Sequence, residues 1–299
     1  MDAYYGGIEA GGTKFVCAIG RDPQNILAQA RFPTTPDETL TRVAAFFTEF
    51  MRQGVPLRGL GVAAFGPLDL NPASPTFGSI LATPKEGWSG VPIAPRLEEQ
   101  TGLKVTLDTD VNGAALGESL WGAAEGTRTS LYLTIGTGIG GGLIVDGKPL
   151  HGLLHPEMGH LRLSHDRVRD PFEGICPFHG DCFEGLASGP ALERRMGQPA
   201  AQISPEHPIW ELEAEYIAQA LHTLICVVSP QKIILGGGVM NQRHLFPRIW
   251  RKVQASLNGY LPLRELQAVD RYIVPPALGA LSGVLGAIAL ARSREEPSR

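Results

Sequence analysis

The chain lacks several features that define whole classes of protein. Its 299 residues contain no apolar run long enough to span a membrane, and the N-terminus lacks the basic and apolar regions of a signal peptide. A formal net charge of -4 excludes the basic field that attracts nucleic acids and anionic membranes. We therefore expect a cytoplasmic protein that has neither a membrane nor a nucleic-acid partner.

Cysteine is scarce, with four residues in the whole chain. Cys17 and Cys226 stand in apolar contexts, and we expect both to be buried thiols. No two cysteines are separated by two residues, which excludes redox chemistry of the CxxC type.

The other two cysteines form a regular pattern with histidine. Cys176, His179 and Cys182 stand three residues apart, and His160 lies sixteen residues before Cys176. Two thiolates and two imidazoles are the ligand set of a closed tetrahedral zinc site, so the metal is expected to be structural. Fixing His160 on zinc would also fix Glu157, which we expect to bind a ligand. The alternatives are scattered polar residues in a surface loop, and a glutamate that faces water.

Glycine, in contrast, is abundant, with 37 residues that cluster in turns. Residues 4–9 and 14–19 read as strands joined by a hairpin turn whose glycines tolerate positive φ. Residues 26–32 read as a third strand, and Thr35 with Glu38 predicts a capping box that opens a helix. Alternating strands and helices follow at 60–65, 93–101, 105–107 and 112–121. Asp110 precedes the last helix as either a general base or its N-cap.

The same order then restarts. Strands are predicted at 130–135 and 141–145 around a second glycine turn, and Asp146-Gly147 predicts a hairpin turn into a third strand. Helices at 188 onward and 210–229, a strand at 232–235, a helix that begins after Gly238, a strand at 272–274 and a helix at 281–291 complete the chain. The pattern indicates a duplicated α/β unit with a cleft between the copies.

Three glycine turns follow strands at Gly11-Gly12, at Gly136-Thr137-Gly138 and at Gly236–Gly238. Without Cβ atoms, such turns let backbone N–H groups approach a phosphate. The alternative is that each is only a tight turn. The chain contains no G-x-x-x-x-G-K-[ST] motif, and the second turn lies between two strands, which argues against a dinucleotide-binding fold.

Taken together, these motifs resemble the ROK sugar kinases. The likeness is carried by Gly6-Gly-Ile-Glu-Ala-Gly-Gly-Thr-Lys14, Gly66-Pro67, Asp110-Val-Asn112, Gly136-Thr-Gly-Ile-Gly140, Glu157-Met-Gly-His160, the cysteine and histidine run, and Gly236-Gly-Gly-Val239. The bacterial fructokinase branch is the most similar. The resemblance implies a duplicated actin-like ATPase (ribonuclease H-like) fold with an interdomain cleft. We expect residues 1–112 with 281–299 to form one domain, and 113–280, with a zinc loop at 155–185, to form the other.

The resemblance also implies that MgATP phosphorylates a hexose, with D-fructose to fructose 6-phosphate as the expected reaction, in a homodimer with a structural zinc. Alternatives are a mannose or glucose kinase and a non-catalytic sugar-binding relative. Asp110 would be the general base. Sugar contacts would come from Gly66, Asn112, Glu157 and His160. Contacts to ATP and Mg²⁺ would come from Glu9, Gly11, Gly12, Thr13, Lys14, Thr137, Gly138, Pro190, Gly236, Gly237 and Gly238.

Three positions depart from the family pattern. Thr109 stands where most members have Asn immediately before the base. His179 replaces a cysteine of the metal run, and Glu9 stands where relatives outside this branch often have Asp. The first departure concerns one sugar contact, and the second concerns the softness of the zinc ligands. The third concerns the magnesium role of Glu9.

Overall fold

The structure, a computed structural model, describes residues 3–83, 85–262 and 264–293. They form two compact units. The first contains the chain up to Gly126, the segment Gly147–His155 and the residues from Ala277 on, and the second contains Thr127–Asp146 and Pro156–Pro276. The domain limits expected from the sequence remain a prediction. Residues 294–299 of the expected C-terminal helical segment lie outside the described residues.

The first unit is built on a sheet with the strand order β3-β2-β1-β4-β5. Its strands are β1 (Tyr4–Ala10), β2 (Lys14–Gly20), β3 (Ile26–Pro33), β4 (Leu57–Ala64) and β5 (Val105–Thr109). Strands β1, β4 and β5 are parallel, and Ala10, Ala64 and Thr109 stand side by side in their registers. The segments that follow these three strands therefore leave the sheet at the same edge, where α/β proteins bind ligands.

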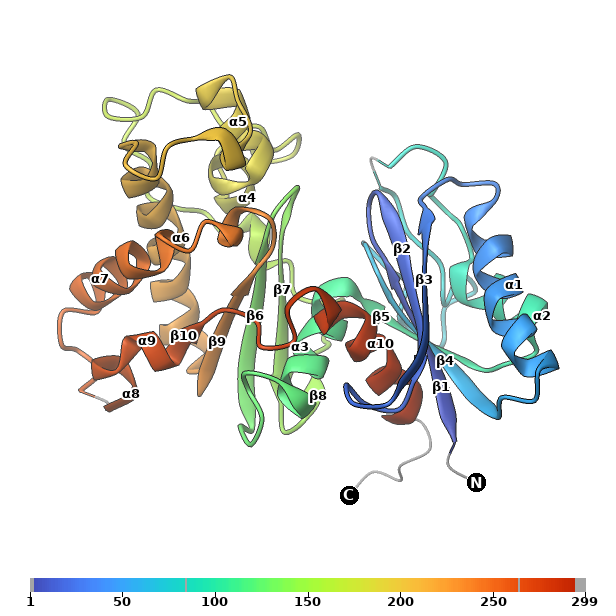
Figure 1. Cartoon of the computed structure of the whole chain (residues 1–299). Coiled ribbons are helices and arrows are strands. Elements are labelled where there is room, and N and C mark those ends of the chain that lie inside the picture. Colours follow the sequence, from blue (N-terminus) through green and yellow to red (C-terminus); the bar gives the residue numbers. More distant parts are fainter. Residues whose placement is uncertain (1–2, 84, 263, 294–299) are drawn as a thin grey trace. The chain divides into compact units, whose positions relative to one another are not determined.

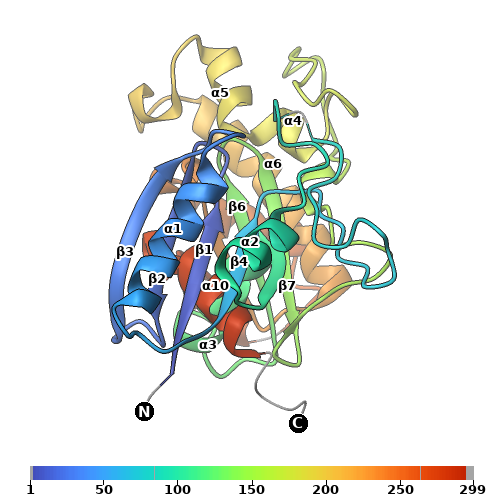
Figure 2. The same cartoon turned by 90° about the vertical axis from the view of Figure 1, so that its right-hand side faces the viewer.

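Helices cover both faces of this sheet (Figure 1). Helices α1 (Thr39–Arg52) and α2 (Ile93–Thr101) lie on one face and are nearest the viewer in Figure 2. Helices α3 (Asp110–Trp121) and α10 (Ser282–Ser293) pack on the other. Glycine permits the close approach of α3 and α10, because a Cβ on Gly286 would lie 1.7 Å from the Gly113 carbonyl oxygen.

The second sheet repeats this topology. Its strands β6 (Thr129–Ile135), β7 (Ile139–Val145), β8 (Lys148–Pro149), β9 (Lys232–Gly236) and β10 (Ile273–Val274) have the order β10-β9-β6-β7-β8. Strand β6 is antiparallel to β7 and parallel to β9, as β1 is to β2 and β4. Asp146 and Gly147 both have positive φ in the predicted turn between β7 and β8. The expected duplication is confirmed.

The helices of the second unit are α4 (Phe183–Ala187), α5 (Gly189–Met196), α6 (Ile209–Val228), α7 (Leu245–Leu257), α8 (Arg264–Gln267) and α9 (Val269–Tyr272). Side chains of α6 and α7 share one buried core with the strands, in which Trp210 and Ile249 are 0% exposed. Short 3-10 helices occupy Met158–His160, Ala200–Gln202, Val239–Asn241 and, in the first unit, Gly279–Leu281. No helix of the described residues is long and apolar enough to cross a membrane.

Several predicted details are wrong. Helix α1 begins at Thr39 without the expected capping box, because the buried Thr39 hydroxyl donates to the Pro33 carbonyl at 2.6 Å and accepts from the Thr35 N–H at 2.7 Å. The helix expected directly after Gly238 begins only at Leu245, where Pro247 fits the first turn.

Two smaller predictions also fail. Tyr272 ends α9 rather than beginning a strand, since its buried hydroxyl donates to the Pro230 carbonyl. Cys226 is exposed, because it lies on the same outward face of α6 as His222, whose Nε2 is 3.9 Å from its Sγ.

Candidate active site

The first glycine turn connects β1 and β2. The Gly11 N–H donates to the Lys14 carbonyl at 3.1 Å, and the Thr34 hydroxyl donates to the Gly11 carbonyl at 2.8 Å. Neither Gly11 nor Gly12 has the positive φ that the sequence suggested. Glycine is needed at 11 for another reason, since a Cβ there would lie 2.8 Å from the Lys14 carbonyl oxygen. Thr13 and Lys14 are exposed beside it.

A lysine that the sequence analysis missed lies on this turn. Nζ of Lys85 donates to the Gly12 carbonyl and lies 5.0 Å from the centre of the Phe65 ring. Burial lowers the pKa of Lys85. Three residues later, Trp88 is 1% exposed, and its ring lies 5.6 Å from that of Phe65, so this loop is anchored close to the turn. The signal in the sequence was a tryptophan three residues after a lysine.

Two carboxylates of the first unit interact at the ends of β1 and β5. Burial, followed by the negative charge of Asp110, raises the pKa of Glu9 to about 7, and the charges of Lys14 and Arg31 oppose the shift. Helix α10 leaves room for Glu9 at Gly283, where a Cβ would lie 2.4 Å from its carboxyl carbon. A pair of carboxylates that repel each other in this way is a donor set suited to a divalent cation.

The cap of α3 is Thr109, not Asp110. The Thr109 hydroxyl accepts a hydrogen bond from the Asn112 N–H at 3.1 Å, which is the usual contact of an N-cap. Asp110 is the first residue of the helix, and its Oδ1 accepts from the Val111 N–H at 2.9 Å. The interpretation of Asp110 as the cap is therefore wrong, and the departure at Thr109 has a structural role.

Asn112 belongs to a polar cluster that was only partly predicted. Its Nδ2 donates to Oδ1 of Asp108 at 2.8 Å, and Nε2 of His151 lies 3.0 Å from Oδ2 of the same aspartate. Asp108 and His151 were missed, although an aspartate within a buried strand is uncommon enough to have been noticed. Gly66, predicted to contact sugar, follows β4, and a Cβ there would lie 3.5 Å from the His155 ring.

The second glycine turn connects β6 and β7 in the second unit. The Gly136 N–H donates to the Gly138 carbonyl at 2.9 Å, and the Gly189 N–H donates to the Gly136 carbonyl at 2.7 Å. Glu184 Oε2 accepts from the Ile139 N–H at 2.8 Å and would lie 2.8 Å from a Cβ on Gly138. Thr137 is exposed at the tip. Pro190 lies in the first turn of α5, close to the chain that supports this loop.

The third glycine run divides into packed and open positions. A Cβ on Gly236 would lie 2.2 Å from the Tyr132 hydroxyl, and Gly237 has a φ of +91° with the Ile135 carbonyl against it. Packing therefore requires glycine at 236, and packing together with the positive φ requires it at 237. Gly238 is exposed and has no atom within 4 Å of an added Cβ, so its surface is open to a ligand.

The four expected metal ligands come together. Their donor atoms all lie within 4.8 Å of one another, with Sγ–Nδ1 distances of 3.8 Å for Cys176 with His160, 3.6 Å for Cys176 with His179 and 3.6 Å for Cys182 with His160. Ligands at the bond lengths of tetrahedral zinc would be separated by about 3.6 Å. Burial raises the pKa of the Cys182 thiol to about 11. A bound metal would displace the proton of this thiol.

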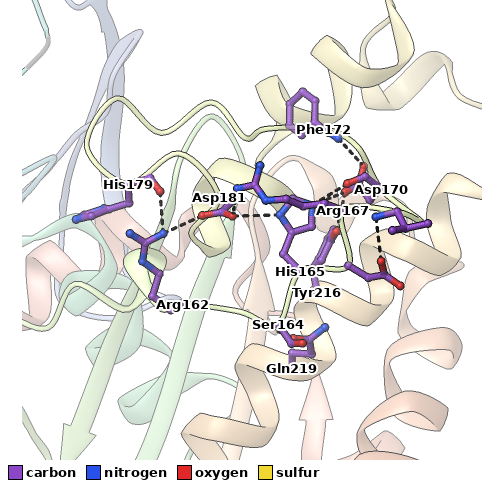
Figure 3. A network of polar contacts seen from close by, with 12 residues as sticks. Arg162, Ser164, His165, Arg167, Asp170, Phe172, His179, Asp181, Tyr216 and Gln219 are labelled. Atoms are coloured by element: carbon purple, nitrogen blue, oxygen red, sulfur yellow. Dashed lines mark hydrogen bonds and ion pairs between the residues drawn. The ribbon is translucent and has the colours of Figure 1, made fainter.

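A turn and a polar network support this cluster. Cys176 and Gly180 exchange backbone hydrogen bonds of 3.2 and 2.9 Å. Beside them, the carboxylates of Asp170 and Asp181 hold the loop (Figure 3). Their side-chain partners are Arg162, His165, Arg167, Arg195 and Tyr216. The loop is therefore held by polar contacts, some buried and some exposed, that spacing alone did not predict.

Glu157 is positioned by the segment that carries His160. It precedes the 3-10 helix Met158–His160, and its carbonyl accepts from the His160 N–H at 3.1 Å. Its side chain is exposed. The backbone thus connects Glu157 to His160, and a ligand-binding role for its carboxylate stays a prediction.

Comparisons with known proteins agree with this arrangement. The family model described as "ROK family" matches residues 5–294. A fructokinase of Pediococcus pentosaceus is 44% identical over 289 residues, which cover 96% of this chain and 97% of that one. A fructokinase of Zymomonas mobilis is also 44% identical, over 296 residues and 97% of each chain.

Among solved structures, a ROK hexokinase from Thermus thermophilus is 30% identical, with a TM-score of 0.78 over 98% of this chain and 99% of that one. The duplicated sheets therefore have the actin-like ATPase fold of the ROK sugar kinases. With nearly its whole length matched by the family model and by these relatives, the chain belongs to the ROK family.

Proposed function

We propose that this protein transfers the γ-phosphoryl group of ATP to D-fructose, giving fructose 6-phosphate. The observation that carries the proposal is the position of Asp110, a carboxylate at the end of β5 whose expected capping role is taken by Thr109. The relatives named fructokinases support fructose as the sugar. The alternative is a kinase for mannose or glucose. The likeness to a ROK hexokinase favours this alternative over a non-catalytic sugar-binding protein.

In this mechanism Asp110 accepts the proton of the sugar hydroxyl while that oxygen attacks the γ-phosphorus of ATP, and ADP leaves. Asn112 and Glu157 bind other sugar hydroxyls. The N–H groups of the turn at Gly11–Lys14 and those of the turn at Gly136–Gly138 are each assigned to phosphate contacts, and Gly238 is assigned to the adenosine. Lys85 adds a positive charge beside the first turn, where negative charge develops during transfer.

Two metals fit the residues present. Glu9 would hold Mg²⁺, because a cation there would offset both its burial and the negative charge of Asp110. Bound Mg²⁺ supplies neutralisation of the phosphate charge. His160, Cys176, His179 and Cys182 would hold Zn²⁺ with four protein ligands, which makes it structural. The resemblance to the fructokinase branch further supports a homodimer in the cytoplasm.

A coupled spectrophotometric assay of ADP formation with MgATP and a panel of hexoses tests the proposal. We expect the highest kcat/KM with D-fructose and, by phosphorus NMR, a product phosphorylated at C6. A higher kcat/KM with mannose or glucose would establish the alternative kinase. Sugar binding without ADP formation from any hexose would contradict catalysis altogether.

A further inference from the structure

Asp108 is a buried carboxylate that two side chains share. Its side chain is 5% exposed, and its oxygens accept from Asn112 Nδ2 at 2.8 Å and contact Nε2 of His151 at 3.0 Å. The Thr109 N–H also donates to it, at 2.7 Å. An ionised carboxylate can only accept hydrogen bonds, so Asp108 decides which atoms of its partners face it. Asn112 must present its amide nitrogen, and His151 a protonated Nε2.

With Asn112 and His151 oriented in this way, Oδ1 of Asn112 and Nδ1 of His151 are left to bind a ligand. Oδ1 of Asn112 is buried and has no hydrogen-bond partner within the described part of the chain. Unpaired buried acceptors are rare in folded proteins, and a bound donor would satisfy this one. His151 is the accessible member of the cluster, with 40% of its side chain exposed, and its Nδ1 is not used by Asp108.

The chemistry of these atoms restricts the ligand. An amide oxygen needs a donor, which a hydroxyl provides and a phosphate oxygen does not. His151 Nε2 lies 3.5 Å from Asn112 Nδ2, so one polyhydroxyl compound can reach both side chains. The hydrogen bond that His151 donates to Asp108 also raises the pKa of His151, which keeps Nδ1 a donor over a wider range of pH.

We propose that His151 is a specificity-determining residue that binds a sugar hydroxyl through Nδ1, and that Asp108 is the positioning residue that orients both His151 and the sugar-binding oxygen of Asn112. The proposal rests on hexose phosphorylation as the function. It adds two residues to the sugar side of the site and assigns the sugar hydroxyl next to His151 as a recognition element.

The first experiment measures steady-state kinetics and calorimetric sugar binding for His151→Ala. Loss of one neutral hydrogen bond should raise the KM for fructose and its Kd by about two- to tenfold, with the KM for ATP unchanged. His151→Gln should recover part of the loss, since its amide can donate to Asp108 and offer a second polar atom. His222→Ala, at a half-buried histidine that contacts Ser256, is the matched control and should change neither constant.

The second experiment tests the positioning role. Asp108→Asn presents an amide that can turn its donor toward Nδ2 of Asn112, so the Asn112 amide should rotate and lose its outward acceptor. The fructose KM should rise more than in His151→Ala. Combining Asp108→Asn with Asn112→Asp restores a donor and an acceptor in reversed order and leaves an outward oxygen. The double variant should therefore bind fructose more tightly than either single variant.

The possible outcomes separate this inference from the proposed function. An active wild-type enzyme whose fructose KM and Kd are unchanged in His151→Ala would overturn the role of His151 alone. A double variant no better than Asp108→Asn would overturn the positioning role. A wild-type protein that binds fructose without phosphorylating it would contradict the proposed function, while the Kd comparison would still decide the inference. Absence of any hexose binding would overturn both.

Discussion

The two halves of the chain share one strand order but surround their first glycine turns differently. The backbone of the turn after β1 is contacted by a lysine, because Lys85 Nζ donates to the Gly12 carbonyl. The turn after β6 has a glutamate behind it, because Glu184 accepts from the Ile139 N–H at 2.8 Å. Topology thus determines where each turn lies, whereas side chains from outside the repeated strands determine its charge and its rigidity.

The same contrast holds for the rest of the two halves. In the first, carboxylates at the ends of parallel strands provide the groups proposed for chemistry, Glu9 and Asp110. In the second, a loop inserted after the three-stranded meander provides the proposed zinc site. On the proposed function, the reactive carboxylates therefore lie in the first copy, whereas the second copy carries the zinc loop.

The largest effect should come from the first half. A positioned base typically contributes about 10²- to 10⁴-fold, so Asp110→Asn should lower kcat by roughly this factor. Nucleotide binding, measured by calorimetry, should persist because the turns hold the phosphates. Asp37→Asn is a control in an exposed turn. A folded Asp110→Asn enzyme with normal kcat would show that the first half does not supply the base.

A variant of the zinc site tests the supporting role of the loop in the second half. Cys176→Ser should lose close to one equivalent of zinc per chain by elemental analysis, and its thermal midpoint should fall because the loop loses a cross-link. The exposed Cys226 provides the control Cys226→Ser, which should keep both metal and stability. Metal-free wild-type protein with undiminished stability would contradict a structural metal.

A matched pair of variants compares the two turns directly. Gly138→Val meets Glu184, which its hydrogen bond to Ile139 holds in place, whereas Gly12→Val meets only the far end of the long, flexible Lys85 side chain. Both should raise the KM for ATP, by about fivefold or more for an overpacking cost of about 1–3 kcal/mol. Only Gly138→Val should also lower the thermal midpoint. Equal stability losses would mean that the turns are equally rigid.

The sequence predicted the strands and the duplication well, because hydrophobic runs, glycine turns and the Asp146-Gly147 hairpin depend on local chemistry. The metal ligands were predicted for a similar reason, since regular spacing placed three of them in one loop. The sequence left open whether Asp110 caps α3, because Thr109 and Asp110 are both good capping residues and only the observed hydrogen bond to the Asn112 N–H separates them.

Contacts between distant segments were not predictable from local patterns. His151 reaches Asp108 across 43 residues, and Lys85 reaches Gly12 across 73. The network around Asp170 and Asp181 likewise depends on the folded path of the loop (Figure 3). Such pairs follow from tertiary structure, which a pattern along the chain does not encode.

The prediction with the smallest expected effect compares two buried glutamates, one from each half. Glu118 on α3 is 0% exposed and accepts from the N–H groups of Ala123 and Leu278 at 2.8 and 2.9 Å and from the Ser282 hydroxyl at 2.7 Å. Glu213 on α6 is 1% exposed, and neither of its carboxyl oxygens has a hydrogen-bond partner within the described residues. Burial raises the pKa of Glu213 well above its usual value, and the charge of Arg195 only partly opposes this shift.

Glutamine should therefore have opposite effects at the two positions. Because the pKa of Glu213 is higher in the folded state, the unfolded chain binds fewer protons above about pH 4.5, and stability falls as pH rises beyond that point. Glu213→Gln should remove this fall, so it should stabilise the protein at pH 8 and lose the advantage near pH 4.5. Glu118→Gln should destabilise it by about 1–3 kcal/mol, because one amide group cannot accept from all the donors now directed at the carboxylate. Urea unfolding at pH 5 and pH 8 measures both, and destabilisation by Glu213→Gln at pH 8 would show that this carboxylate is stabilised in the core after all.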